Sequence, residues 1–187
     1  MKEAIGGTWL YGLAITLIAL FTTFVSVTTN YARTYKIKDH IISIIEANDG
    51  VTEDTLNEIS DYLASTGYAS TGECPKEPDG SKTKWHPFMY GETSPSGYGG
   101  EVNYCIIKHV VTCRVKSETD ETNSFLRGQQ SYNSFPRAYY GVTTFFRLDW
   151  PILRQFIKVN LTGETSIIYM VNTSSEIQTF ADEDLCK

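Results

Sequence analysis

Charge is missing from the first part of this 187-residue chain: the 29 positions from Ala4 to Ala32 hold no Asp, Glu, Lys or Arg. Within them, Trp9 to Val27 is dense in Leu, Ile, Ala, Phe and Val. About 20 apolar residues cross the roughly 30 Å hydrocarbon core of a bilayer as a helix. A cleaved secretory signal has a basic start, a shorter apolar run and an Ala-x-Ala exit, and this sequence lacks that combination. We therefore expect an uncleaved, single-pass transmembrane helix.

Proline is absent from the first 74 residues, so no helix breaker stands at the membrane face. Ile37, Ile41, Ile44 and Ile45 recur at helical spacing with charged residues between them, which predicts an amphipathic continuation of the same helix. The sequence 48–50, Asn-Asp-Gly, supplies a C-terminal stop. One helix from about residue 4 to 47 would be roughly 65 Å long. Its isoleucine stripe would pack on a second helix or on the chain's own head.

Motifs of known catalytic centres are also absent: the sequence has no G-x-S-x-G elbow, no H-E-x-x-H and no Walker loop. His40, His86 and His109 are scattered, and we expect each to be structural or solvated. The net charge is −6 and no long basic patch is present, which disfavours nucleic-acid binding. These absences predict a protein that is not an enzyme and uses no metal or cofactor.

A short second helix is predicted between Thr52, a good N-cap, and Gly67, a good C-terminal stop. Leu56, Ile59 and Leu63 give it a small apolar face. Beyond it the composition turns to Thr, Ser, Tyr, Gly and Asn, typical of a β-rich region.

Strand and turn signals divide the rest of the chain. We expect a long loop over 70–100, strands over 102–115 and 139–148, and a hairpin turn at 162–164 between strands 156–161 and 165–170. The predicted fold is α+β: a long N-terminal helix, transmembrane then amphipathic, a short second helix and an antiparallel β-rich head. The predicted domains are a stalk over 1–47 and an extracytoplasmic head over 48–187.

Four cysteines, Cys74, Cys105, Cys113 and Cys186, all follow the apolar run. An even count in an exported head suggests disulfides, and three pairings are possible. Cys105 and Cys113 would lie roughly 26 Å apart along an unbroken strand. A bridge needs Cα atoms within about 7 Å, so these two pair only if the chain turns between them. We favour Cys74–Cys105 and Cys113–Cys186; four reduced thiols in a cytosolic head are the alternative.

The side of the membrane on which the head lies is indicated by conflicting signals. Arg33, Lys36 and Lys38 follow the span, and the positive-inside rule would place the head in the cytoplasm. The cysteines, and a head poor in charge and rich in Tyr, Thr, Ser and Gly, suit an oxidising exterior. We give these features more weight and predict a head outside the cytoplasm, at the cell surface.

A long N-terminal helix, apolar first and amphipathic second, that carries a small β-rich head resembles the plan of type IV pilins and pseudopilins. The closest likeness is to the small TadE-like pseudopilins of bacterial tight-adherence pilus systems. The residues that carry it are Trp9 to Ile45 and, more weakly, 140–146 and 161–165. The resemblance implies a membrane-anchored structural or assembly subunit of a surface pilus or secretion apparatus. Its partners would be the lipid bilayer, other pilin-like subunits and membrane proteins of the assembly platform.

The N-terminus departs from the pilin pattern. Pilins are cut after a Gly and keep a Glu at the fifth mature position. Gly6 and Gly7 are possible processing sites, but cutting after them leaves Tyr11 or Gly12 at that position. The departure points to a minor or accessory subunit, or to a chain that is never cut.

Assembly through the helix would use small residues for close packing in lipid and the amphipathic stripe beyond it. The predicted interface consists of Gly12, Ala14, Ala19, Ile37, Ile41, Ile44 and Ile45. Ordinary membrane-helix composition is the alternative explanation for the small residues. A second hypothesis for function is a single-pass tethered module whose head binds a glycan or protein. The loop aromatics Trp85, Phe88 and Tyr90 would then form the binding surface, unless they form a small core of their own.

Overall fold

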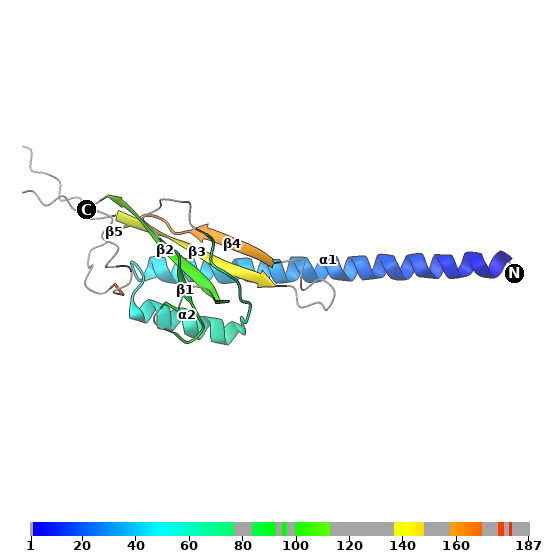
Figure 1. Cartoon of the computed structure of the whole chain (residues 1–187), viewed down its shortest axis with the longest axis horizontal. Helices are drawn as coiled ribbons and strands as arrows, with labels where there is room; N and C mark the ends of the chain where they lie inside the picture. Colours follow the sequence, from blue (N-terminus) through cyan, green and yellow to red (C-terminus); the bar gives the residue numbers. More distant parts are fainter. Residues whose placement is uncertain are drawn as a thin grey trace, which may run out of the picture.

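A 46-residue helix, α1, extends far beyond the rest of the molecule at its N-terminal end, and the head is built on its C-terminal end (Figure 1). The computed structural model describes residues 2–76, 84–92, 95–96, 100–112, 137–147, 158–169, 176–177 and 180. Its helices and strands are α1 (Lys2–Ala47), α2 (Glu53–Thr66), β1 (His86–Phe88), β2 (Tyr104–Thr112), β3 (Arg137–Arg147), β4 (Lys158–Glu164) and β5 (Ile168–Tyr169). The predicted α+β fold, with a long apolar N-terminal helix and an antiparallel sheet, is confirmed.

The junction between the two helices forms where the sequence signals place it. Helix α1 ends at Ala47, and Asp49 and Gly50 follow with positive φ angles of 54° and 142°. Thr52 caps α2: its hydroxyl accepts from the backbone N–H of Thr55, and the Thr55 hydroxyl accepts from the backbone N–H of Thr52. Gly67 closes α2 in the left-handed conformation. The predicted stops and the cap are confirmed, and they turn α2 back alongside α1.

The sheet has the order β1-β2-β3-β4, all antiparallel, with β5 also paired to β3. In the centre Ile106 lies opposite Val142, and at one end of β3 Phe146 lies opposite Val159. The expected loop over 70–100 contains β1, whose three residues are all buried. The expectation of an unstructured loop there is therefore wrong for this stretch.

The predicted hairpin turn at 162–164 is also wrong, because these residues belong to β4 and pair with 141–143 of β3. Gly163 has a different purpose. A Cβ there would come within 2.8 Å of Ile42 and 2.9 Å of the Lys38 Nζ. The glycine lets α1 approach β4 closely. Close approach of another backbone is a common reason for glycine within a strand.

The main core lies between the sheet and the two helices. From α1 it takes the whole isoleucine stripe, Ile37, Ile41, Ile44 and Ile45, which is at most 4% exposed. The apolar face of α2 and the inward side chains of β2 and β3 complete it: Leu56, Ile59, Leu63, Tyr104, Ile106, Tyr140 and Val142. Packing of the stripe on the chain's own head, one of the two expectations for it, is confirmed.

A smaller core covers the opposite face of the sheet, where Val102, Cys105 and Phe145 pack with Cys74 and Trp85. The predicted Cys74–Cys105 disulfide is present, with an S–S distance of 2.01 Å and Cα atoms 5.8 Å apart. It closes a separation of 31 residues, and bridges of this kind typically contribute about 2–4 kcal/mol to stability. Cys113 and Cys186, the other predicted pair, lie outside the described residues.

Candidate functional site

The N-terminal half of α1 exposes an apolar surface that the rest of the described chain does not cover. Among the described residues, Trp9–Ala47 is the one helix long and apolar enough to cross a membrane, and its most apolar 18-residue stretch is entirely unburied. The large side chains that it exposes are Trp9, Leu10, Tyr11, Leu13, Ile15, Leu17, Ile18, Leu20, Phe21, Phe24 and Val25. A surface of this extent needs lipid or other apolar chains to cover it.

Five threonines in the N-terminal part of α1 form hydrogen bonds to their own helix. The hydroxyls of Thr16, Thr23 and Thr29 donate to the carbonyl oxygens four residues back, at 2.9, 2.7 and 2.8 Å. Those of Thr22 and Thr28 do the same at 3.0 and 2.9 Å. An unpaired hydroxyl is costly in hydrocarbon, whereas a hydroxyl bonded to its own helix is tolerated there. The threonines are therefore compatible with a lipid environment.

The residues predicted to form a helix interface separate into three groups. Gly12 and Ala19 are seven positions apart and share one face of α1, and Ala14, two positions beyond Gly12, points to nearly the opposite face. All three are exposed, and a Cβ on Gly12 would touch nothing within 4 Å. The four isoleucines are enclosed in the head, so they reach a second copy only if the head moves away. Gly6 and Gly7, the possible processing sites, lie within α1.

At the base of the head, two cations that follow the apolar run are held by the fold. The guanidinium of Arg33 donates to the carbonyl of Thr66, the last residue of α2. Lys38 is 7% exposed; its ammonium lies 4.1 Å from the centre of the Tyr35 ring and 3.2 Å from the carboxylate of Asp39. The Arg33 contact ties α1 to the end of α2, whereas both of these partners of the Lys38 ammonium lie on α1 itself.

At the other end of the head, a buried polar cluster holds residues from close to the C-terminus. Lys108 of β2 forms an ion pair of 2.6 Å with Glu176, and the two side chains are only 5% and 4% exposed. The Lys108 ammonium also donates to the carbonyl of Phe180 at 3.2 Å, and the Tyr140 hydroxyl donates to Glu176 at 2.5 Å. Phe180 itself is fully buried in the main core. This cluster was not predicted from the sequence, where a lysine, Lys108, within an apolar strand was the available signal.

Buried tyrosines make the stability of the head depend on alkaline pH. Burial raises the pKa of Tyr68, Tyr104 and Tyr140, and the Glu176 carboxylate raises the pKa of Tyr140 further. In the unfolded chain these phenols ionise near pH 10. Above that pH the unfolded state loses protons that the folded state keeps, so stability falls.

We expect the three buried tyrosines to add no pH dependence to the free energy of unfolding below about pH 9. Above about pH 10 it should fall by up to about 1.4 kcal/mol per pH unit for each of the three buried phenols. Denaturant unfolding of the full chain in detergent, followed across this range by tyrosinate absorbance, measures the slope. Tyr104→Phe should reduce the slope by about one third. Reversible ionisation of all three phenols in a head that stays folded would contradict the prediction.

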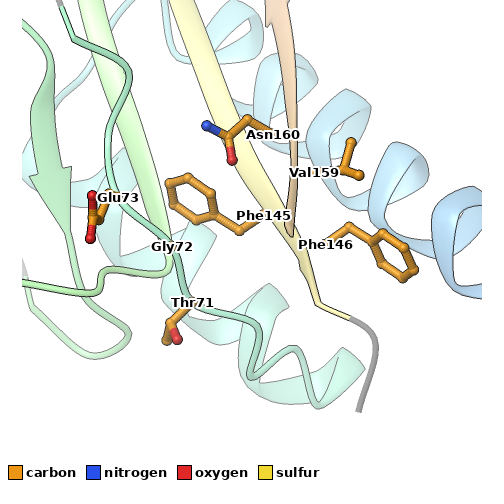
Figure 2. Close-up of a pocket in the computed structure, with 7 residues that line it drawn as sticks. All are labelled: Thr71, Gly72, Glu73, Phe145, Phe146, Val159 and Asn160. Atoms are coloured by element: carbon orange, nitrogen blue, oxygen red, sulfur yellow. The ribbon is translucent and has the colours of Figure 1, made fainter. Parts of the chain in front are cut away.

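An open cavity of about 530 Å³ lies beside the end of β3 and the start of β4. Figure 2 shows its seven lining residues: Thr71, Gly72, Glu73, Phe145, Phe146, Val159 and Asn160. Phe145 is directed to the strip 71–73, whereas Phe146 and Val159 are directed to the side of α1. Among the described residues that line the cavity, Glu73 supplies a carboxylate, Thr71 a hydroxyl and Asn160 an amide. The Thr71 hydroxyl already donates to Glu101 at 2.8 Å.

The aromatic residues of the alternative binding hypothesis are not gathered on one surface. Phe88 is fully buried and stacks on Tyr104 with ring centres 5.4 Å apart. Trp85 is half-buried in the smaller core, and Tyr90 is 50% exposed. Phe88 belongs to the main core and Trp85 to the smaller one, so these aromatics do not form the separate small core that was the alternative expectation.

The three histidines are each in contact with an aromatic ring. The ring centres of His40 on α1 and Tyr62 on α2 lie 3.9 Å apart. His86 meets Phe180 edge-on, and His109 stacks on Tyr139. Within the described part of the chain, no three His, Cys, Asp or Glu residues are grouped so that they could hold a metal ion.

The fold and the exposed helix together define a class. A long N-terminal apolar helix, followed by an antiparallel sheet that packs on its second half, is a pilin-like architecture. Comparison of the chain with protein-family models, with curated proteins and with solved structures finds no match. The assignment to the class therefore depends on the architecture alone.

Proposed function

We propose that this chain is a membrane-anchored, pilin-like subunit that acts by assembly and not by catalysis. More specifically, it would be a TadE-like pseudopilin of a bacterial surface pilus or secretion apparatus. The observation that carries the proposal is the form of α1, a single helix whose exposed apolar half continues without interruption into the core of the head. An anchor joined rigidly to its head transmits force and position, as a subunit of an assembly requires.

The bilayer is the first partner in this proposal. The apolar surface from Trp9 to Val25 has no cover from the described residues, and its threonines need no water. The apolar run from Trp9 to Val27 has 19 residues, close to the roughly 20 that cross the hydrocarbon core as a helix. A soluble protein would have to bury this surface in an interface with other chains.

The proposed location of the head is outside the cytoplasm. The Cys74–Cys105 disulfide supports this location, because disulfides persist in oxidising compartments. By the positive-inside rule, the cations after the span would favour a head in the cytoplasm, but they are weak evidence for that orientation. Arg33 has a structural partner at the end of α2, and Lys38 is buried beside Gly163 of β4, which accounts for their presence without reference to topology.

Contacts with further subunits would use the exposed face of α1. Gly12 and Ala19 allow a second helix to come close, and association in lipid depends on such packing. The isoleucine stripe is already occupied by the head. In our proposal it fixes the head to the helix, and the apolar half of α1 makes the contacts between subunits.

Thiol crosslinking in membranes of the producing cells tests the assembly proposal. Cysteine is introduced at Ala19 in one variant and at Ala14, on nearly the opposite face, in another. The parent chain is the background control, since its own cysteines are present in all three. We expect a short bifunctional reagent to give dimers with Ala19→Cys and few with Ala14→Cys. Dimer yields no higher than the parent in both variants would contradict assembly through this helix.

One observation favours the second candidate function, a tethered binding module. The cavity beside 71–73 is open and combines apolar walls from Phe145, Phe146 and Val159 with the polar groups of Glu73 and Asn160. A chain that stays monomeric in the crosslinking experiment would favour this second function, with the cavity as the binding site.

A further inference from the structure

The apolar half of α1 ends close to where the head begins. Trp9 to Val27 spans 19 residues, or about 28 Å of helix, close to the thickness of the hydrocarbon core. The first residue of α1 buried by the head is Thr34, at 4% exposure. Thr34 lies seven positions beyond Val27, or about 10 Å along the helix. The headgroup layer on one side of a bilayer takes up about 5–8 Å of that distance.

Two other elements of the head reach the same level along α1. The last residue of α2, Thr66, accepts the hydrogen bond from Arg33. On the sheet, Gly163 faces Lys38 and Ile42, and Val159 lies four residues earlier on β4, about 13 Å away. Figure 1 shows β4 starting at the end of the sheet that points to the N-terminal half of α1. Since 13 Å corresponds to about nine residues of helix, Val159 lies level with about residues 29–33 of α1.

The side chains at this level are of the kind that lipid headgroups accommodate. Tyr31 and Tyr35 are 45% and 46% exposed on α1, and Val159, which lines the cavity, is 37% exposed. Lys36 is exposed beside them. Tyrosine is enriched at membrane interfaces, and a lysine there reaches phosphate groups.

We infer that this base of the head, formed by Tyr31, Tyr35, Lys36, the end of α2 and Val159, rests directly on a phospholipid surface. The partner is the headgroup layer of the bilayer that holds α1, so the inference depends on the proposed membrane anchoring. No free stalk separates the head from the membrane. The head then stands at a fixed height and orientation, with its sheet running away from the bilayer.

Depth measurements on the full chain in vesicles test the inference. A fluorophore is attached through a non-natural keto side chain at one of three exposed apolar positions: Phe21 in the span, Val159 at the base, or Ile167 at the far end. Ile167 is 52% exposed and adjoins β5, which pairs with the start of β3, about 26 Å of strand from Phe146. The vesicles contain phosphatidylethanolamine and phosphatidylglycerol, with a quencher at the headgroup or deep in the acyl chains.

We expect the headgroup quencher to act severalfold more strongly on the label at Val159 than on the label at Ile167. The deep quencher should act on the label at Phe21 alone. If Phe21 is quenched deeply while Val159 and Ile167 respond equally weakly, the head stands clear of the membrane and the inference is wrong. If Phe21 escapes the deep quencher, the anchoring itself fails, and the proposed function fails with it.

Discussion

Ile18→Arg is expected to release the chain from membranes, lowering its insertion equilibrium by roughly 100-fold. Ile18 lies at the middle of the apolar run and is 61% exposed. An arginine at the centre of a transmembrane helix costs about 2.5–3.5 kcal/mol on insertion scales, and every 1.4 kcal/mol is a factor of ten. The fraction that stays with the membrane after alkaline carbonate extraction measures the effect.

The matched control for Ile18→Arg is the same substitution at Ile167, an apolar residue of comparable exposure on the head. It adds the same charge to the chain at a site expected to face water, so membrane retention should not change. A membrane fraction that survives Ile18→Arg undiminished would show that α1 is not held by burial in lipid.

Features decided within one helical turn were predictable from the sequence. The α1 stop, the Thr52 cap and the Gly67 stop depend on residues that contact one another locally, so the capping rules identify them without knowledge of the rest of the fold. The exposed apolar run was predictable for a similar reason, since length and composition alone define it.

Features decided by distant contacts were not predictable in the same way. Gly163 looked like a turn residue because the sequence does not show that α1 crosses β4 at that position. The isoleucine stripe has the same periodicity whether it meets the chain's own head or another chain. Burial against the sheet resolves this ambiguity for the folded subunit, whereas helical spacing alone could not.

The disulfide could be predicted only in part from the sequence. Strand geometry disfavoured a bridge between Cys105 and Cys113, but spacing left three pairings open. The Cys74–Cys105 bridge forms because residues 71–76 cross the outer face of the sheet. There the backbones of Gly72 and Val102 are joined by hydrogen bonds. A Cβ on Gly72 would come within 2.3 Å of the Phe145 ring, so the glycine permits this close crossing.

The buried ion pair between Lys108 and Glu176 joins strand β2 to residues near the C-terminus. Its environment is the main core: Phe180 packs against Phe88 and Tyr140, and the backbone N–H of Ile177 donates to Val51 at 3.2 Å. Breaking a buried pair by removing one partner leaves an uncompensated charge in the interior and typically costs about 3–5 kcal/mol. This segment therefore contributes to the stability of the whole head.

Glu176→Ala should accordingly lower the free energy of unfolding of the full chain by about 3–5 kcal/mol. The Lys108 ammonium then keeps its hydrogen bond to the Phe180 carbonyl but loses its counter-ion, and the Tyr140 hydroxyl loses its acceptor. In detergent, the thermal midpoint followed by near-ultraviolet circular dichroism should drop by roughly 10 °C. Far-ultraviolet helicity should fall less than the near-ultraviolet signal, because the described head does not bury the most apolar stretch of α1.

The triple variant Lys108→Met, Tyr140→Phe and Glu176→Leu separates charge burial from lost packing. It removes both charges and the hydroxyl together and keeps similar side-chain volumes. Buried ion pairs replaced in this way by apolar residues are often neutral or stabilising. We therefore expect the triple variant to recover most of the stability that Glu176→Ala loses. A triple variant as unstable as Glu176→Ala would mean that the pair itself, and not the avoidance of a lone buried charge, holds the C-terminal residues in place.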